Sequence, residues 1–177
     1  QLIPEQAQNF EFGVKLNTSS IQAEIVYFLR NTDNLIEWAR VDATQPWQPQ
    51  NYNKVQISGF ETSFNYRVNP SSRLIQVKQV MISYNYLNAD LKQGSMPEQE
   101  SRYALTALKN QLIGGLLLGI GTKTEWNAKM RNVERMNQEP YFLLDMRVDY
   151  NRTGKVGFFA EASNITNTDY IEAGTVQ

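Results

Sequence analysis

The stretch NFEFGVKLNTSSIQAEIVYFLRNTDNLI, residues 9–36, alternates large apolar residues with polar ones on both sides of a short polar turn. In its first half, Phe10, Phe12, Val14 and Leu16 share one parity, and polar or small residues occupy the other. Successive side chains of a strand point to opposite faces, so the pattern predicts two antiparallel strands joined by NTSS. The alternation leaves open whether the apolar face packs in a protein core or faces lipid.

Similar segments follow along the rest of the chain, and they predict an all-β protein built as an antiparallel meander of about eight long strands. A change of parity at Ser58 and Gly59 predicts a β-bulge there. Leu105, Leu108 and Leu112 have helical spacing, so a helix over 101–115 remains an alternative. The further predicted strands span 52–68, 74–90, 110–120, 122–136, 141–151 and 155–165.

Composition restricts the possible functions more than it identifies one. The chain has 177 residues, enough for one domain, and its net charge of -1 without a basic cluster argues against nucleic acid as a partner. It contains no Cys and no His, so thiolate nucleophiles, the commonest general base and ordinary zinc sites are excluded within it. We therefore predict that the protein is not an enzyme and that it has no cofactor, no metal site and no catalytic residues.

Strand length and loop asymmetry favour a membrane barrel. The predicted strands exceed the mean of about five or six residues in globular proteins and match the about nine to eleven that a tilted strand needs to cross a membrane. The connections NTSS, NPSSR, GIGT and NRTG are short, whereas 31–51 and 91–109 are long. Short turns at one rim and long loops at the other are typical of outer-membrane barrels. A soluble β-protein with an internal apolar face remains an alternative.

In the membrane reading, the polar parity of the strands lines a hydrated lumen, and the long loop 31–51 lies outside the cell. Asp145, Arg147 and Asp149 are interpreted as cross-strand ion pairs and not as an acid–base pair. The loop residues that we expect to contact a ligand are Trp38, Arg40 and Trp47. The predicted lumen-lining residues are Glu24, Arg30, Glu125, Lys129, Arg131, Asp145, Arg147, Asp149 and Glu161.

Two motifs near the ends of the chain resemble those of TonB-dependent outer-membrane receptors. LIPEQAQNFEFGVKL resembles the passage L-x-P-E followed by N-x-E-x-G by which these receptors enter a barrel strand. AEASNITNTDY is similar to their near-terminal signature E-x-x-N-L-F-N/D-x-x-Y, with Thr166 standing where Phe is usual. The residues matched are Pro4, Glu5, Asn9, Glu11 and Gly13 in the first motif, and Glu161, Asn164, Ile165, Asn167 and Tyr170 in the second.

Between these motifs, the stretches SRYALTALKNQL, WNAKMRNVERM and YFLLDMRVDY resemble Bacteroidetes receptors of the cobalamin and siderophore type. This resemblance implies that residues 1–177 are a C-terminal segment of the barrel in the bacterial outer membrane, without the plug domain and the final strand. It implies active uptake of a large scarce nutrient, with outer-membrane lipid and a small-to-medium nutrient ligand as partners and with TonB acting through the plug region. A passive porin or structural barrel, or a soluble binding module, is the alternative function.

Overall fold

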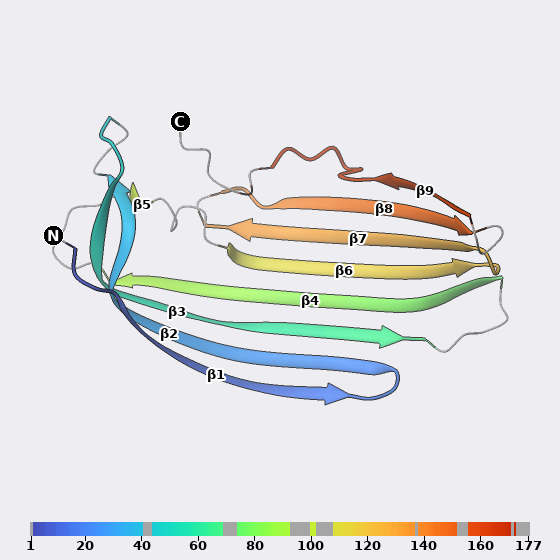
Figure 1. Ribbon diagram of the computed structural model, residues 1–177, viewed down its shortest axis with the longest axis horizontal. Helices are drawn as coiled ribbons and strands as arrows, with labels where there is room; N and C mark the ends of the chain where they lie inside the picture. Colours follow the sequence, from blue (N-terminus) through green and yellow to red (C-terminus); the bar gives the residue numbers. More distant parts are fainter. Residues whose placement is uncertain are drawn as a thin grey trace.

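The structure is a computed structural model that describes residues 2–40, 44–68, 74–92, 100–101, 108–136, 138–151, 156–170 and 172. These residues form one curved antiparallel sheet in the order β1-β2-β3-β4-β6-β7-β8-β9, with the short β5 paired to β2 (Figure 1). The all-β meander predicted from the sequence is confirmed, with nine strands. They are β1 (Gln6–Asn17), β2 (Ile21–Arg40), β3 (Gln48–Arg67), β4 (Ile75–Lys92), β5 (Glu100–Ser101), β6 (Leu108–Ile120), β7 (Thr124–Arg135), β8 (Tyr141–Asn151) and β9 (Gly157–Ala162).

The prediction of a long loop at 31–51 is wrong for most of its length. β2 continues to Arg40 and β3 already begins at Gln48, so the two strands form an extended hairpin that bends upward at the left of Figure 1. β5 pairs with the end of β2, on the edge opposite β3. The two strands of this hairpin are paired through their backbones. Residues 31–51 do not alternate apolar with polar side chains, so the sequence pattern did not predict these strands.

The irregularities in strand pairing lie at positions that the sequence did not predict. The register runs without a break through Ser58 and Gly59, so the predicted bulge there is wrong. Val55 and Ile57 simply face the polar side of the sheet, and Val55 is buried there. The register shifts instead between Val77 and Gln79 and between Leu108 and Asn110. Leu108 and Leu112 lie in a strand, which removes the helical alternative from 108 onward, while Leu105 lies outside the described residues.

Cross-strand pairing joins the apolar residues of neighbouring strands into one surface, which we call the apolar face. One row of this face runs from Val14 through Ile25, Thr62 and Tyr84 to Leu112. Its side chains are unusually exposed for large hydrophobic groups, with Phe12 at 63% and Phe158 at 64%. A continuous exposed apolar surface of this size marks an interaction face. The opposite surface, which carries most of the charges, is called the polar face.

The two ends of the sheet differ. The turns at 18–20 and 121–123 lie at the right-hand end in Figure 1, and the β2–β3 hairpin rises from the other end. On β8 the apolar face runs from Phe142 to Tyr150, eight residue steps or about 27 Å of strand. On a strand tilted by about 40°, this length spans about 20 Å of height, close to the apolar band of about 25 Å of outer-membrane barrels. The right-hand end is named the turn rim and the other the loop rim.

Packing on the polar face is close in two places. Val133 and Leu143 are each only 1% exposed, and they pack with Tyr141, whose ring stacks on Tyr170 at 4.9 Å between centroids. At Gly59, an added Cβ would lie 2.1 Å from the carbonyl oxygen of Tyr86 and 2.8 Å from the ring of Phe28. Glycine is therefore required where the Phe28 ring crosses β3.

Candidate functional site

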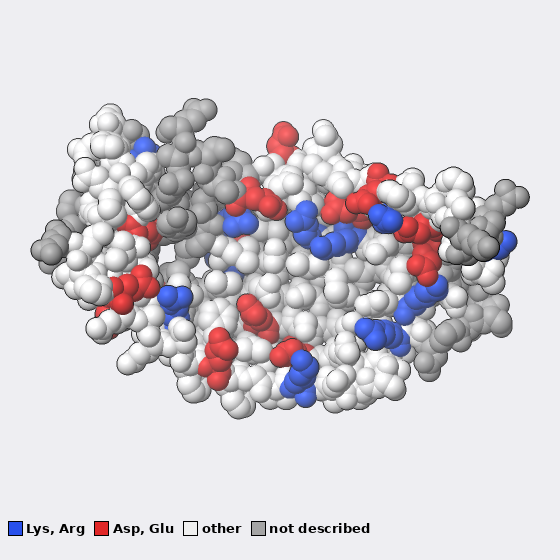
Figure 2. Space-filling view, in the orientation of Figure 1, with Lys and Arg blue, Asp and Glu red and all other residues white. Residues whose placement is uncertain are grey.

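The polar face is the candidate functional surface. All nine residues predicted to line a lumen lie on this one side, as the strand register shows: Glu24, Arg30, Glu125, Lys129, Arg131, Asp145, Arg147, Asp149 and Glu161. Figure 2 shows charged side chains across this face, densest over the upper strands, which are β7–β9 in Figure 1. That these residues line a lumen stays a prediction.

Arg147 is at the centre of the densest charge network. Its Nε donates to Asp149 Oδ2 at 2.9 Å, its Nη2 donates to Asp149 Oδ1 at 2.8 Å, and its Nη1 donates to Glu161 Oε2 at 3.1 Å. Its guanidinium carbon also lies 4.3 Å from the centroid of the Phe159 ring. One cation bound by two carboxylates and a ring is held in a fixed place, so this group is a structural element of the face. Arg147 forms the predicted cross-strand ion pair with Glu161 of β9, and it also pairs with Asp149 within β8.

A second network joins the end of the chain to β7 and β8. Arg131 Nη2 lies 3.8 Å from Asp145 Oδ2, and its Nη1 lies 3.4 Å from Glu172 Oε1. The backbone N–H of Asn164 donates to the other Asp145 oxygen at 2.8 Å. Asn164 adopts a left-handed φ of 49°, and its side chain bonds both the N–H and the carbonyl of Thr168. The segment after β9 is thereby fixed along β8.

Other predicted residues form simpler pairs. Lys15 Nζ lies 3.4 Å from Glu24 Oε2, Arg30 Nη2 lies 3.3 Å from Glu5 Oε1, and Lys78 Nζ lies 2.5 Å from Glu125 Oε1. Lys129 forms no ion pair with any residue that the structure describes. Sequence reasoning missed the partners Glu5, Lys78, Phe159 and Glu172. The signal for Lys78 was the parity change from Val77 to Val80, because the bulge turns this extra residue onto the polar face.

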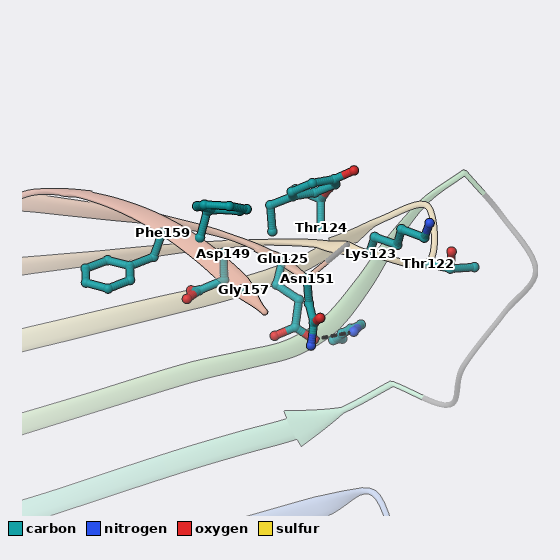
Figure 3. Close-up of a pocket in the computed structure, with 11 residues that line it drawn as sticks. Thr122, Lys123, Thr124, Glu125, Asp149, Asn151, Gly157 and Phe159 are labelled. Carbon is teal, nitrogen blue, oxygen red and sulfur yellow. Dashed lines mark hydrogen bonds and ion pairs between the residues drawn. The ribbon is translucent and has the colours of Figure 1, made fainter. Parts of the chain in front are cut away.

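The polar face is hollowed at the turn rim. An open cavity of about 960 Å³ lies between the β6–β7 turn and the start of β9. Figure 3 shows Glu125 and Asp149 directed into it, with Thr122 and Lys123 at the turn and Phe159 on β9. Lys78 pairs with Glu125 at the lining, and Arg147 pairs with Asp149 beside it.

Of the predicted ligand-contacting residues, Trp38 and Arg40 lie in β2, whereas Trp47 lies in the connection directly before β3. The guanidinium carbon of Arg40 lies 4.4 Å from the centroid of the Trp47 ring, so the structure brings these two together. Trp38 lies two residues before Arg40 and is 43% exposed. The indole Nε1 of Trp47 is buried and has no hydrogen-bond partner among the described residues. The hairpin thus displays an aromatic and cationic group beyond the apolar band.

The described residues contain no group of three or more Asp or Glu side chains placed to hold a metal ion. No helix formed by them is long and apolar enough to cross a membrane.

Comparison with known proteins identifies the fold. The family model described as TonB dependent receptor-like, beta-barrel matches residues 1–165. The vitamin B12 transporter BtuB of Photobacterium profundum is 22% identical over 180 residues, covering 98% of this chain and 28% of that protein. The solved structure of the copper transporter OprC superposes with a TM-score of 0.73 at 16% identity, covering 97% of this chain and 27% of that one.

The chain therefore spans less than a third of the length of these relatives. Both relatives are transporters, in agreement with the prediction that the protein is not an enzyme. The family match covers most of the chain, so the outer-membrane barrel is confirmed over the soluble alternative, while the lumen-lining role of the polar face stays a prediction. This chain belongs to the TonB-dependent receptor-like β-barrel family of the bacterial outer membrane.

Proposed function

We propose that this chain supplies barrel wall and extracellular surface to an outer-membrane receptor that actively takes up a large, scarce nutrient, such as cobalamin or a siderophore. The observation that carries the proposal is the division of the sheet into an exposed apolar face and a charged polar face over one membrane thickness. In a closed barrel the first face contacts lipid and the second lines the lumen. The residues form part of the C-terminal barrel, and a plug region elsewhere in the protein would meet TonB.

The β2–β3 hairpin is the part of the chain that we expect to meet the ligand first. From Asn31 to Arg40, β2 continues nine residue steps beyond the apolar band, or about 30 Å. Trp47 and Arg40 combine a flat apolar surface with a cation, which suits a ligand with a large planar or anionic part. A ring of this kind can act as an anchor for binding.

An organic nutrient or an organic metal chelate is favoured over a bare copper ion. Copper sites in proteins are usually built from imidazole, thiolate or thioether ligands. The chain contains neither His nor Cys; of its described methionines, Met130 and Met146 lie on the apolar face, Met81 lies on the polar face of β4 and Met136 follows β7. The described part of the chain therefore offers a copper ion no imidazole and no thiolate ligand.

Uptake assays on the full-length receptor test the proposal. Cells that carry it as their sole receptor should accumulate labelled cobalamin or a labelled ferric siderophore, and accumulation should stop when TonB is deleted or the proton gradient is collapsed. Uptake that is unaffected by loss of TonB would instead establish a passive porin. Failure to bind or transport any member of a panel of such nutrients would contradict the proposal.

The hairpin's role can be tested separately. We expect Trp47→Ala to weaken binding of the transported nutrient about tenfold, since a stacked aromatic anchor is lost. Trp126→Ala is the matched control, because Trp126 lies on the apolar face opposite Val148, away from the hairpin. Equal losses in the two variants, measured by nutrient binding to the purified receptor, would remove Trp47 from the binding surface.

A further inference from the structure

The chain beyond β9 crosses from the edge of the sheet onto the polar face. Its first residues run along β8 toward the loop rim (Figure 1). Its later residues lie over the polar face, because Tyr170 stacks on Tyr141 of β8 and Glu172 reaches Arg131 of β7. We call residues 163–170 and 172 the arm, which has its base on β8 and its tip on β7.

The base of the arm is held more firmly than its tip. The Asn164 N–H donates to Asp145 at 2.8 Å, and the Asn164 side chain closes a turn through bonds of 2.9 and 3.0 Å to the backbone of Thr168. At the tip, Glu172 is 52% exposed, and its ion pair with Arg131 spans 3.4 Å. Ion pairs of exposed side chains contribute little to stability. The tip can therefore leave Arg131 while the base stays in place.

Arg131 is less well satisfied than the other arginine of this region. Arg147 donates from Nε, Nη2 and Nη1 to two carboxylates at 2.9, 2.8 and 3.1 Å. Among the described residues, Arg131 donates one hydrogen bond, to Glu172 at 3.4 Å, and its Nη2 stays 3.8 Å from Asp145. Its buried Nε has no partner in this part of the chain. Since a guanidinium has five N–H donors, Arg131 keeps donors for a further acceptor.

A second buried donor beside Arg131 also lacks an acceptor. Tyr141 is only 7% exposed, and its hydroxyl bonds to none of the described residues. In the register of β7 and β8, Tyr141 is the diagonal neighbour of Arg131 on the polar face, and long side chains at such positions reach one another. Buried polar groups are normally hydrogen-bonded. A hydroxyl and a guanidinium N–H without acceptors therefore mark a place that is suited to an acceptor group.

Lys129 adds a cation to these donors. It is exposed, lies two residues before Arg131 on the same face, and forms no ion pair with a described residue. Its direct neighbours are Asp145 on β8 and Gly115 on β6, and the second of these brings no charge. With the tip seated, the two cations face Asp145 and Glu172, and the charges cancel. With the tip withdrawn, one positive charge is in excess, which favours an anion.

We propose that Arg131, Lys129 and Tyr141 form a binding site for a carboxylate of the nutrient, and that Glu172 occupies this site until the nutrient displaces it. The resident group indicates the class of ligand, because Glu172 already presents a carboxylate to the guanidinium. A nutrient carboxylate also engages the free Nε of Arg131 and the ammonium of Lys129, and charge-assisted bonds of this kind are the strong ones. As a nutrient site, it rests on the proposed uptake function, in which the polar face lines the lumen.

Binding of tricarballylate, a small tricarboxylate probe, to the purified full-length receptor in micelles tests the site. Isothermal titration compares the unchanged receptor with Glu172→Gln, which removes the competing charge and keeps the size of the side chain. We expect Glu172→Gln to bind the probe about tenfold more tightly, which corresponds to a tip that is seated about nine-tenths of the time in the unchanged receptor. Addition of Lys129→Met to Glu172→Gln should weaken binding about tenfold, because a charge-assisted contact is lost.

The ion pair between Lys15 and Glu24 on the same face supplies matched controls. Glu24→Gln releases Lys15 as Glu172→Gln releases Arg131, and Lys15→Met, added to Glu172→Gln, removes an exposed lysine as Lys129→Met does. Neither control should change probe affinity by more than about twofold, because exposed charges at this distance are screened. Equal effects of Glu24→Gln and Glu172→Gln would overturn the site. Binding that does not depend on Lys129, or the absence of saturable binding to Glu172→Gln, would also overturn it.

The titration requires neither TonB nor transport, so its outcome is separate from that of the uptake assays. The expected changes in probe affinity, found in a receptor that takes up no nutrient, would retain the site and refute the uptake function. Uptake in a receptor whose probe affinity ignores Glu172 and Lys129 would retain the uptake function and refute the site.

Discussion

The first four strands and the last four hold their polar faces together by different means. On β1–β4 the close contacts include neutral ones, as where Phe28 lies across Gly59 and where Gln79 donates to Asn65 at 2.9 Å, and the ion pairs are single ones. On β6–β9 the charged networks around Arg147 and Arg131 lie beside the buried cluster of Val133, Leu143 and Tyr141, and a segment beyond β9 is fixed to β8. The same alternation of residue types thus yields one region with isolated ion pairs and another in which charge networks are added to apolar packing.

The largest effect that would test this contrast is expected at Gly59. Gly59→Ala forces a Cβ against the Tyr86 carbonyl and the Phe28 ring, and we expect a loss of about 3 kcal/mol of unfolding free energy. Gly157→Ala is the control, because its Cβ would meet only the Tyr150 carbonyl at 3.6 Å, and it should change stability by less than about 0.5 kcal/mol. Guanidinium unfolding of the receptor in micelles measures both, and a similar cost at Gly157 would contradict the difference.

The next largest difference in stability is expected between variants of Asn164 and Asn34, two asparagines with a left-handed backbone conformation. Asn164→Ala loses the side-chain bonds to Thr168 as well as asparagine's tolerance of its φ of 49°, and should cost about 2–3 kcal/mol. Asn34 has a φ of 56°, and its side chain forms no hydrogen bond with a described residue. Asn34→Ala should therefore lower the unfolding free energy by about 1 kcal/mol. If the two variants unfold at the same denaturant concentration, the side-chain network after β9 contributes nothing.

Two tyrosine hydroxyls should respond with opposite signs. Tyr141 is 7% exposed, and its hydroxyl has no partner among the described residues, so Tyr141→Phe should raise stability by about 0.5–1 kcal/mol. The Tyr84 hydroxyl donates to Asn110, so Tyr84→Phe should lower stability by about 1 kcal/mol. Thermal melts of the two variants should move in opposite directions, and a destabilised Tyr141→Phe would point to a partner for that hydroxyl.

The smallest expected difference concerns the ion pairs themselves. Arg147→Met leaves two carboxylates without their shared cation and should lower the denaturant midpoint. Lys15→Met removes a single pair between side chains that are 65% and 43% exposed, and should leave the midpoint unchanged. Added salt should narrow the gap between the variants, because ions screen exposed charges. Indistinguishable midpoints at low salt would refute charge stabilisation of β6–β9.

Alternation was sufficient to predict the strands inside the apolar band and the side of the sheet on which each charged residue lies. The prediction failed at 31–51, because the residues there do not alternate. That stretch was predicted to be a loop, although most of it forms a hairpin. Alternation also misplaced the bulge, because Val55 and Ile57 are apolar residues on the polar face. The contacts of Arg147 with Phe159 and of Arg131 with Glu172 depend on three-dimensional pairing and leave no pattern in the chain.

The bulge at Lys78 has a consequence for how the length of β4 can change. Val77 and Val80 both point to the apolar face, so removal of either residue between them, Lys78 or Gln79, would restore strict alternation and leave every neighbour on its own side. Loss of a single residue near the middle of β4 would instead turn half of the strand over and carry Tyr84 or Ile82 to the polar face. At the bulge, β4 can therefore lose one residue without moving any other side chain to the opposite face. Elsewhere in β4, the two faces are preserved only when residues are lost or gained in steps of two.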